Sequence, residues 1–83
     1  MKIVKYPLST EKSIRMMESE NKLTFIVDKK ATKAEIKKEI EETFKVRVEK
    51  VNTTITHQGI KKAFVRLSMD TPAIDIATQL GLI

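Results

Sequence analysis

The segment 22–28 shows the period-two alternation of a β-strand. Leu23, Phe25 and Val27 fall on one face, and Thr24 and Ile26 fall on the other. Because both faces carry apolar side chains, we expect this strand to be covered at least partly on both sides. The pattern therefore favours three layers, with the sheet in the middle.

A hairpin is predicted in the second half of the chain. Val46 and Val48 alternate in one parity, whereas the apolar positions from Val51 to residue 56 take the other. A bulge near residues 49 and 50 would reconcile the two phases. The turn around Gly59 leads into a clean alternating strand over residues 61–69, with Met69 as its last inward position.

The clearest helix is predicted to begin after Thr32. Thr32 and Glu35 have the spacing of a capping box, and Ile36, Ile40 and Phe44 follow at four-residue intervals along one face.

Two shorter helices flank these elements. Residues 10–20 form one, with Ser9 as a suitable cap, a stripe of Ile14 and Met17, and Asn21 as a left-handed stop. The last begins at Thr71 and Pro72 and stops at Gly81. Its predicted inward residues are Ile74, Ala77 and Leu80.

The order of these elements predicts the fold. With a short edge strand at Lys2–Tyr6, the strand, helix and hairpin form a split β-α-β unit in which the last strand lies between two parallel ones. We therefore predict an α+β fold, an α/β/α sandwich with a small, mostly antiparallel four-stranded sheet of ferredoxin-like type. One domain is expected over residues 1–83.

Composition narrows the possible functions. The formal net charge of +5 suits either a phosphate-rich partner or an ordinary lysine-rich surface. With no Cys, no phosphate-binding glycine loop, and His57 alone in a predicted turn, we expect neither an enzyme nor a cofactor or metal site. Paired acids such as Glu41 and Glu42 are interpreted as solvated helix charges. The absence of a long apolar stretch predicts a cytoplasmic protein.

The helix after Thr32 carries its charges in an unfavourable order. Lysines gather around its start and acids follow, whereas the helix dipole favours the reverse. Pairs such as Lys37 with Glu41 would recover only about 0.2–0.5 kcal/mol each. Two explanations stay open. In the first, the start of this helix attracts an anion such as a phosphate backbone. In the second, the order of the charges changed neutrally during evolution because this face is solvated.

Charge is also distributed unevenly along the chain. Eight of the 16 cations lie between residues 29 and 50, and none follows Arg66, where Asp70 and Asp75 lie instead. The molecule is expected to have a basic side and a neutral or acidic side, which could serve different partners.

The segment KKAFVRL at residues 61–67 partly echoes an RNA-recognition strand. It lacks the further aromatic residues that would stack bases. A helix on each face of the sheet would cover such a platform, so Phe64 is predicted to lie in the core.

Four collinear motifs resemble the universal ribosomal protein L23 family: PLSTEK at 7–12, KKATKAEIK at 29–37, FKVRVEKVNT at 44–53, and KKAFVRL at 61–67. The resemblance implies a sandwich that binds large-subunit ribosomal RNA beside the exit tunnel and lies among neighbouring large-subunit proteins. It also implies docking of the signal recognition particle and the protein-conducting channel.

The same resemblance indicates which residues contact RNA. Lysines supply charge, while Thr and Asn position phosphate or ribose through hydrogen bonds. The predicted RNA contacts are Lys12, Lys29, Lys30, Thr32, Lys33, Lys37, Asn52, Thr53, Lys61 and Lys62. Glu11 matches the family's docking patch for factors that meet the nascent chain, although an acid in a first helical turn also satisfies the dipole.

One departure from the bacterial pattern is the short connection at residues 57–61, where bacterial members carry a long basic hairpin. This resembles the archaeal type, and it implies that a separate small protein fills the tunnel wall. Two alternatives stay open: a protein-docking adapter, and a single-strand RNA-binding module not tied to the ribosome.

Overall fold

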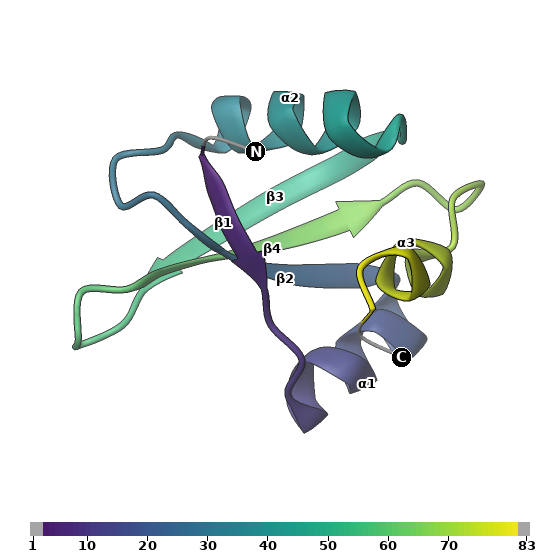
Figure 1. Cartoon of the computed structure of the whole chain (residues 1–83), viewed down its shortest axis with the longest axis horizontal. Coiled ribbons are helices and arrows are strands. Elements are labelled where there is room, and N and C mark those ends of the chain that lie inside the picture. Colours follow the sequence, from purple (N-terminus) through teal and green to yellow (C-terminus); the bar gives the residue numbers. More distant parts are fainter. Residues whose placement is uncertain (1–2, 82–83) are drawn as a thin grey trace.

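The computed structural model describes residues 3–81 and contains four strands and three helices (Figure 1). Their order and bounds are β1 (Val4–Pro7), α1 (Glu11–Glu20), β2 (Lys22–Val27), α2 (Lys33–Phe44), β3 (Val48–Ile55), β4 (Lys61–Leu67) and α3 (Ala73–Gln79). The predicted element order is confirmed. Lys2, where the first strand was predicted to begin, lies outside the described residues.

The four strands form one sheet in the order β1-β2-β4-β3, and every neighbouring pair is antiparallel. Both β2 and β3 run antiparallel to β4, so they are parallel to each other with β4 between them. This is the predicted split β-α-β arrangement. The register of β3 against β4 shifts between Val48 and Lys50, which confirms the predicted bulge.

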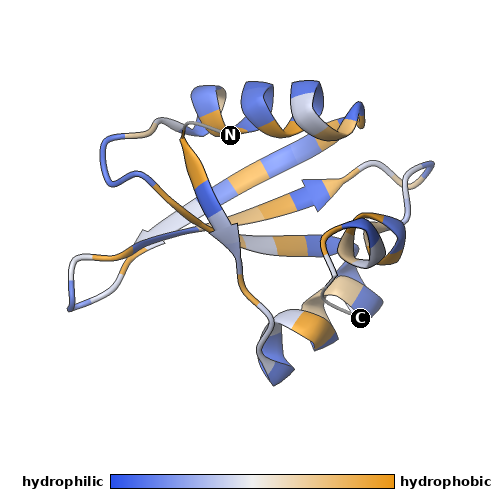
Figure 2. Ribbon diagram, in the orientation of Figure 1, coloured by the Kyte–Doolittle hydropathy of each residue, from blue (hydrophilic) through white to orange (hydrophobic). Residues whose placement is uncertain are grey.

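The helices lie on two sides of this sheet (Figure 1). α2 covers one face, whereas α1 and α3 pack against each other and against β2 on the other side. In α2 the apolar positions lie on the side of the ribbon that faces the sheet, and the polar positions lie on the outer side (Figure 2). The α+β sandwich is therefore confirmed.

The main core lies between α2 and the sheet. Phe25, Ile36, Ile40 and Val65 are fully buried, and the ring of Phe25 stacks on that of Phe44 with 6.4 Å between centroids. Burying each such side chain stabilises the fold by about 1.5–3 kcal/mol. The alternation in β2 and β4 thus supplies one continuous apolar surface for the helix.

The first helix is capped differently from the prediction. Thr10, not Ser9, is the N-cap: its Oγ1 accepts the Ser13 backbone N–H at 3.2 Å, and Ser13 Oγ accepts the Thr10 backbone N–H at 2.8 Å. This reciprocal pair satisfies two otherwise unpaired groups. Ser9 has no matching residue at the required spacing, which is why the cap lies one residue later.

Of the three residues of α3 predicted to face inward, Ala77 and Leu80 are confirmed and Ile74 is wrong. Ile74 is 48% exposed, whereas Ile76 is 3% exposed and Ala73 is buried. Because α3 begins at Ala73, the positions 73, 76, 77 and 80 share one face at helical spacing, and this face packs on α1. Met69, predicted to end β4 inward, is 83% exposed in the turn that follows the strand.

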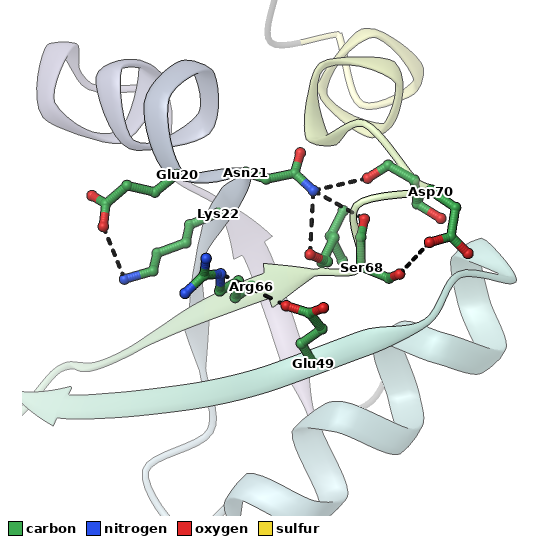
Figure 3. A network of polar contacts seen from close by, with 9 residues as sticks. Glu20, Asn21, Lys22, Glu49, Arg66, Ser68 and Asp70 are labelled. Carbon is green, nitrogen blue, oxygen red and sulfur yellow. Dashed lines mark hydrogen bonds and ion pairs between the residues drawn. The ribbon is translucent and has the colours of Figure 1, made fainter.

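Asn21 joins α1, β4 and α3 at one point (Figure 3). It has φ 56°, which confirms the predicted left-handed stop. Its Nδ2 donates to the carbonyls of Leu67, Ser68 and Thr71 at 3.0–3.2 Å, and its Oδ1 accepts the Ala73 N–H at 2.6 Å. A single side chain therefore fixes the start of α3 against the end of β4.

Candidate nucleic-acid interface

The β3–β4 hairpin has a side that points away from α2 and carries mostly polar residues. In an antiparallel pair, residues directly opposite each other point to the same face. Val51 and Val65 are opposite each other and buried toward α2, so the alternate positions point away from α2. We call these six residues the hairpin face: Lys50, Asn52, Thr54, Lys62, Phe64 and Arg66.

The hairpin face is accessible because α1 and α3 pack mainly on β2. Lys50, Thr54 and Arg66 are exposed, and the other three residues are half-buried. Lys12 of α1 borders this face, since it lines the same small pocket as Lys62 and Phe64.

Phe64 corrects a prediction. It was expected in the core, but it is half-buried and does not belong to the core cluster. The reason is the asymmetric cover of the sheet: α2 spans the inner face, whereas the two helices on the other side leave β3 and much of β4 uncovered (Figure 1).

A second basic group lies where the β2–α2 loop meets the hairpin turn. Lys61 Nζ donates to the Ala31 carbonyl at 2.6 Å, and Lys29 Nζ lies beside Gly59. Lys5 joins them from β1, because it lines the same hollow as Lys29 and Lys61. We call this group the loop end: Lys5, Lys29, Lys30, Lys33 and Lys61.

The predicted RNA contacts therefore divide into groups. Lys12, Asn52 and Lys62 lie on or beside the hairpin face, and Lys29, Lys30, Lys33 and Lys61 lie at the loop end, next to Thr32. Two predicted residues lie apart from both. Lys37 is exposed on α2, and Thr53, opposite Ala63, points to the α2 side of the sheet.

Five residues of these two surfaces were absent from the predicted contacts: Lys5, Lys50, Thr54, Phe64 and Arg66. For the four that lie on the hairpin strands, the alternation of side chains along each strand could have indicated the face. That signal becomes usable only with the register, because the bulge at Val48–Lys50 shifts the parity of β3.

Most cations of these surfaces have no carboxylate partner in the described part of the chain. The ion pairs found between residues 3 and 81 are Arg15–Glu11 at 2.8 Å, Lys22–Glu20 at 3.3 Å and Arg66–Glu49 at 3.8 Å. Lys12, Lys29 and Lys62 are therefore uncompensated locally, which leaves a positive field along the surface.

Two glutamates in the second half of α2 accept hydrogen bonds from backbone N–H groups of other segments. These contacts explain part of the unfavourable order of charges along the helix. The Glu39 carboxylate accepts the N–H groups of Ile3 at 3.0 Å and Val4 at 2.6 Å, and Glu41 Oε2 accepts the Val48 N–H at 2.9 Å. Glu41 is thus a tether rather than the solvated charge predicted, and it forms no ion pair with Lys37. The acids anchor edge strands, and the lysines at the start of the helix stay unpaired.

Thr32 and Lys61 have local roles beside any contact with RNA. Thr32 Oγ1 accepts the Glu35 N–H at 3.2 Å while Glu35 Oε1 accepts the Thr32 N–H at 2.9 Å, so the predicted capping box is confirmed. Lys61 uses one ammonium N–H on Ala31, which leaves its other donors available.

Glu11 lies in the first turn of α1 and is exposed. Its carboxylate pairs with Arg15 one turn later, and both side chains are more than 70% exposed. An exposed pair of this kind contributes little to stability. Glu11 is accessible to a partner, and its ion pair with Arg15 contributes little to the stability of the fold.

The described residues give little support for a metal site or a membrane-spanning helix. The described residues hold no cluster of three or more His, Cys, Asp or Glu side chains placed to bind a metal. His57 is exposed in the hairpin turn, as predicted. Among the described helices, none is both long and apolar enough to cross a bilayer.

Comparison with known proteins identifies the family. Residues 2–76 match the family model described as ribosomal protein L23. The chain is also 48% identical over 82 residues to the large ribosomal subunit protein uL23 of Trypanosoma brucei brucei, covering 99% of this chain and 50% of that relative. The chain thus spans about half the length of the curated relative it matches. On both grounds it belongs to the ribosomal protein L23 family.

Proposed function

We propose that this chain is a structural constituent of the large ribosomal subunit and binds large-subunit ribosomal RNA through the hairpin face and the loop end. The observation that carries the proposal is the set of lysines on these surfaces that have no carboxylate within 4.0 Å in residues 3–81. Unpaired lysines on an accessible surface release counterions when they meet phosphates, which drives binding to nucleic acid.

The mixture of groups on the hairpin face also suits RNA. Lys50 and Lys62 offer charge, while Asn52 and Thr54 offer hydrogen bonds to ribose or phosphate. Phe64 supplies an accessible ring on which an unstacked base can rest. Ribosomal RNA presents phosphates and loops together, which matches this combination.

Membership of the family supports a position near the polypeptide exit tunnel, among neighbouring large-subunit proteins. In this proposal Glu11 contributes to a docking site for nascent-chain targeting factors, the signal recognition particle and the protein-conducting channel. Its exposure on α1, away from the loop end, allows a protein to reach it while RNA occupies the basic surfaces.

The test is salt-dependent binding of the purified chain to large-subunit RNA. A Lys29→Ala, Lys30→Ala, Lys33→Ala variant is compared with the parent and with a matched control, Arg15→Ala, Lys22→Ala, Lys38→Ala. Both triple variants lose the same charge, but the control removes two cations that already have acidic partners.

The loop-end variant is expected to weaken binding and to lower the salt slope by about 0.7–0.9 for each phosphate that it no longer neutralises. The control should keep most of the parent slope. Binding unchanged in the loop-end variant would restrict the interface to the hairpin face. No binding by the parent would overturn the proposal in favour of a protein-docking adapter.

A further inference from the structure

A small pocket lies between the start of α1 and the sheet, at the border of the hairpin face. Its lining includes Lys12, Ser13 and Met16 of α1 together with Thr24, Lys62 and Phe64 of β2 and β4. Its volume is 60 Å³. Since a single water needs about 10–15 Å³ by this measure, the pocket has room for a group of only a few heavy atoms.

Thr24 is the unusual residue of this pocket. Its side chain is 5% exposed, and its Oγ1 is the buried side-chain polar atom without a hydrogen-bond partner in residues 3–81. Leaving a hydroxyl buried and unpaired is unfavourable, and native structures seldom tolerate it without a reason. An incoming group that accepts a hydrogen bond would remove this cost.

The other free groups of the pocket are also donors. Lys12 and Lys62 have no carboxylate within 4.0 Å in the described chain. Ser13 Oγ, in contrast, is occupied, because it donates to the backbone carbonyls of Leu8 and Thr10 and accepts the Thr10 N–H. No carboxylate lines the pocket. Thr10 also lines the pocket, and its Oγ1 accepts the Ser13 N–H. The available donors are therefore the hydroxyls of Thr24 and Thr10 and two ammonium groups around a space of a few atoms.

We propose that this pocket binds one phosphodiester group of the RNA. The Thr24 hydroxyl donates to a phosphate oxygen, and the ammonium groups of Lys12 and Lys62 neutralise the charge. A phosphate fits because it is compact, accepts several hydrogen bonds and carries charge on the oxygens. The ring of Phe64, at the edge of the same pocket, then lies beside the ribose or base of that nucleotide. This inference rests on the proposed RNA binding.

The decisive variant is Thr24→Val, which keeps the shape and removes the hydroxyl. It is expected to leave the denaturation midpoint unchanged or to raise it, since an unpaired buried hydroxyl disappears. The same variant should weaken binding to large-subunit RNA about tenfold. A residue with a purely structural role would not move folding and binding in opposite directions.

Three controls separate the possible causes. Thr24→Ser retains a hydroxyl and should restore affinity. Thr53→Val makes the same chemical change on the opposite side of the sheet and should bind RNA as the parent does. Thr24→Val removes no charge and should keep the salt slope, whereas Lys12→Ala with Lys62→Ala should lower it by about 0.7–0.9 for the one phosphate that they neutralise.

A second measurement uses inorganic phosphate and the free protein. Titration followed by amide chemical shifts should perturb Thr24 and Lys62 in the parent but not in the Lys12→Ala, Lys62→Ala variant. If Thr24→Val binds RNA as tightly as the parent while the loop-end triple variant is weakened, the pocket proposal is wrong and the proposed function stands. If the parent binds no large-subunit RNA, both fall.

Discussion

The end of the sheet next to α3 and the hairpin face use their polar groups in opposite ways. Around Asn21, donors and acceptors meet within the chain, and even the neighbouring cation Lys22 has Glu20 as its partner (Figure 3). On the hairpin face and at the loop end, lysines point outward without such partners. The polar groups of the first region stabilise the fold, whereas the lysines of the second region have no carboxylate partner in residues 3–81.

We therefore expect the first region to affect the free energy of unfolding and the second to affect RNA affinity. Polar groups that are satisfied internally contribute to the free energy of unfolding, whereas uncompensated surface cations contribute little to it. Substitutions in the two regions should therefore have different readouts. A variant near Asn21 should change stability without changing RNA affinity. A variant of the hairpin face or the loop end should change RNA affinity without changing stability.

The largest effect on stability is expected for Asn21→Ala. The variant loses the side chain's hydrogen-bonding contacts with four backbone groups and keeps a left-handed backbone that Ala disfavours, so it should lower the free energy of unfolding by about 2–4 kcal/mol. Urea denaturation measures it. Asn21→Gly tolerates the positive φ and should lose less. RNA affinity measured on folded protein should not change, and a loss of affinity there would contradict the separation of the two regions.

On the binding side, Lys50→Glu with Lys62→Glu should reduce affinity for large-subunit RNA by about 100-fold. The control is Arg15→Glu with Lys38→Glu, which changes the net charge equally away from the hairpin face and should reduce affinity less than about tenfold. Both proteins should unfold close to the parent midpoint. Equal losses of affinity would mean that net charge, rather than the hairpin face, governs binding.

A smaller effect on stability is expected at the tether between α2 and β1. Glu39→Gln removes one of the two oxygens that accept the Ile3 and Val4 N–H groups, and should cost about 1–2 kcal/mol. Hydrogen exchange at those two amides should quicken. Glu42→Gln, on the same helix but exposed, should change stability by less than about 0.5 kcal/mol and leave that exchange rate unchanged.

The smallest effect concerns Asp70, on the acidic side. A hydrogen bond from Ser68 Oγ at 2.5 Å lowers the pKa of Asp70, with smaller contributions from its own backbone and from Arg47. Because the folded pKa is below the unfolded one, this stabilisation is present above the unfolded pKa and is lost as pH falls through the folded pKa. Ser68→Ala should raise the pKa of Asp70 in a carboxyl NMR titration. Asp75→Asn should leave the titration of Asp70 as in the parent.

Much of the fold could be predicted from the sequence because its signals act locally. The Thr32–Glu35 capping box, the left-handed Asn21 and the bulge before Lys50 each depend on residues a few positions apart. The alternation in β2 and the spacing of Ile36 and Ile40 depend only on the periods of strand and helix. The predictions that were wrong for Ile74 and Phe64 concern which side of an element is covered, and that depends on distant helices.

Prediction of the candidate site had the same limit, because contacts between distant segments could not be inferred from the sequence. The sequence located lysine-rich segments and, through motifs, the family, so Lys29, Lys30 and Lys33 were predicted as neighbours simply because the chain joins them. It could not place Lys5 at the loop end, nor Lys50 and Lys62 on the same face of the hairpin, because these positions depend on strand order and register.

By itself, the sequence determined the elements, their order, the helix stops, the basic character and the family, since each follows from short-range hydrogen bonding, periodicity or motif. Only the tertiary structure decided that Glu39 holds the N–H of Ile3, 36 residues away, and that Thr24, Lys12 and Lys62 share one pocket. These contacts join residues from separate elements, and their geometry is set by sheet register and helix packing. The surfaces proposed to bind RNA are defined at that level.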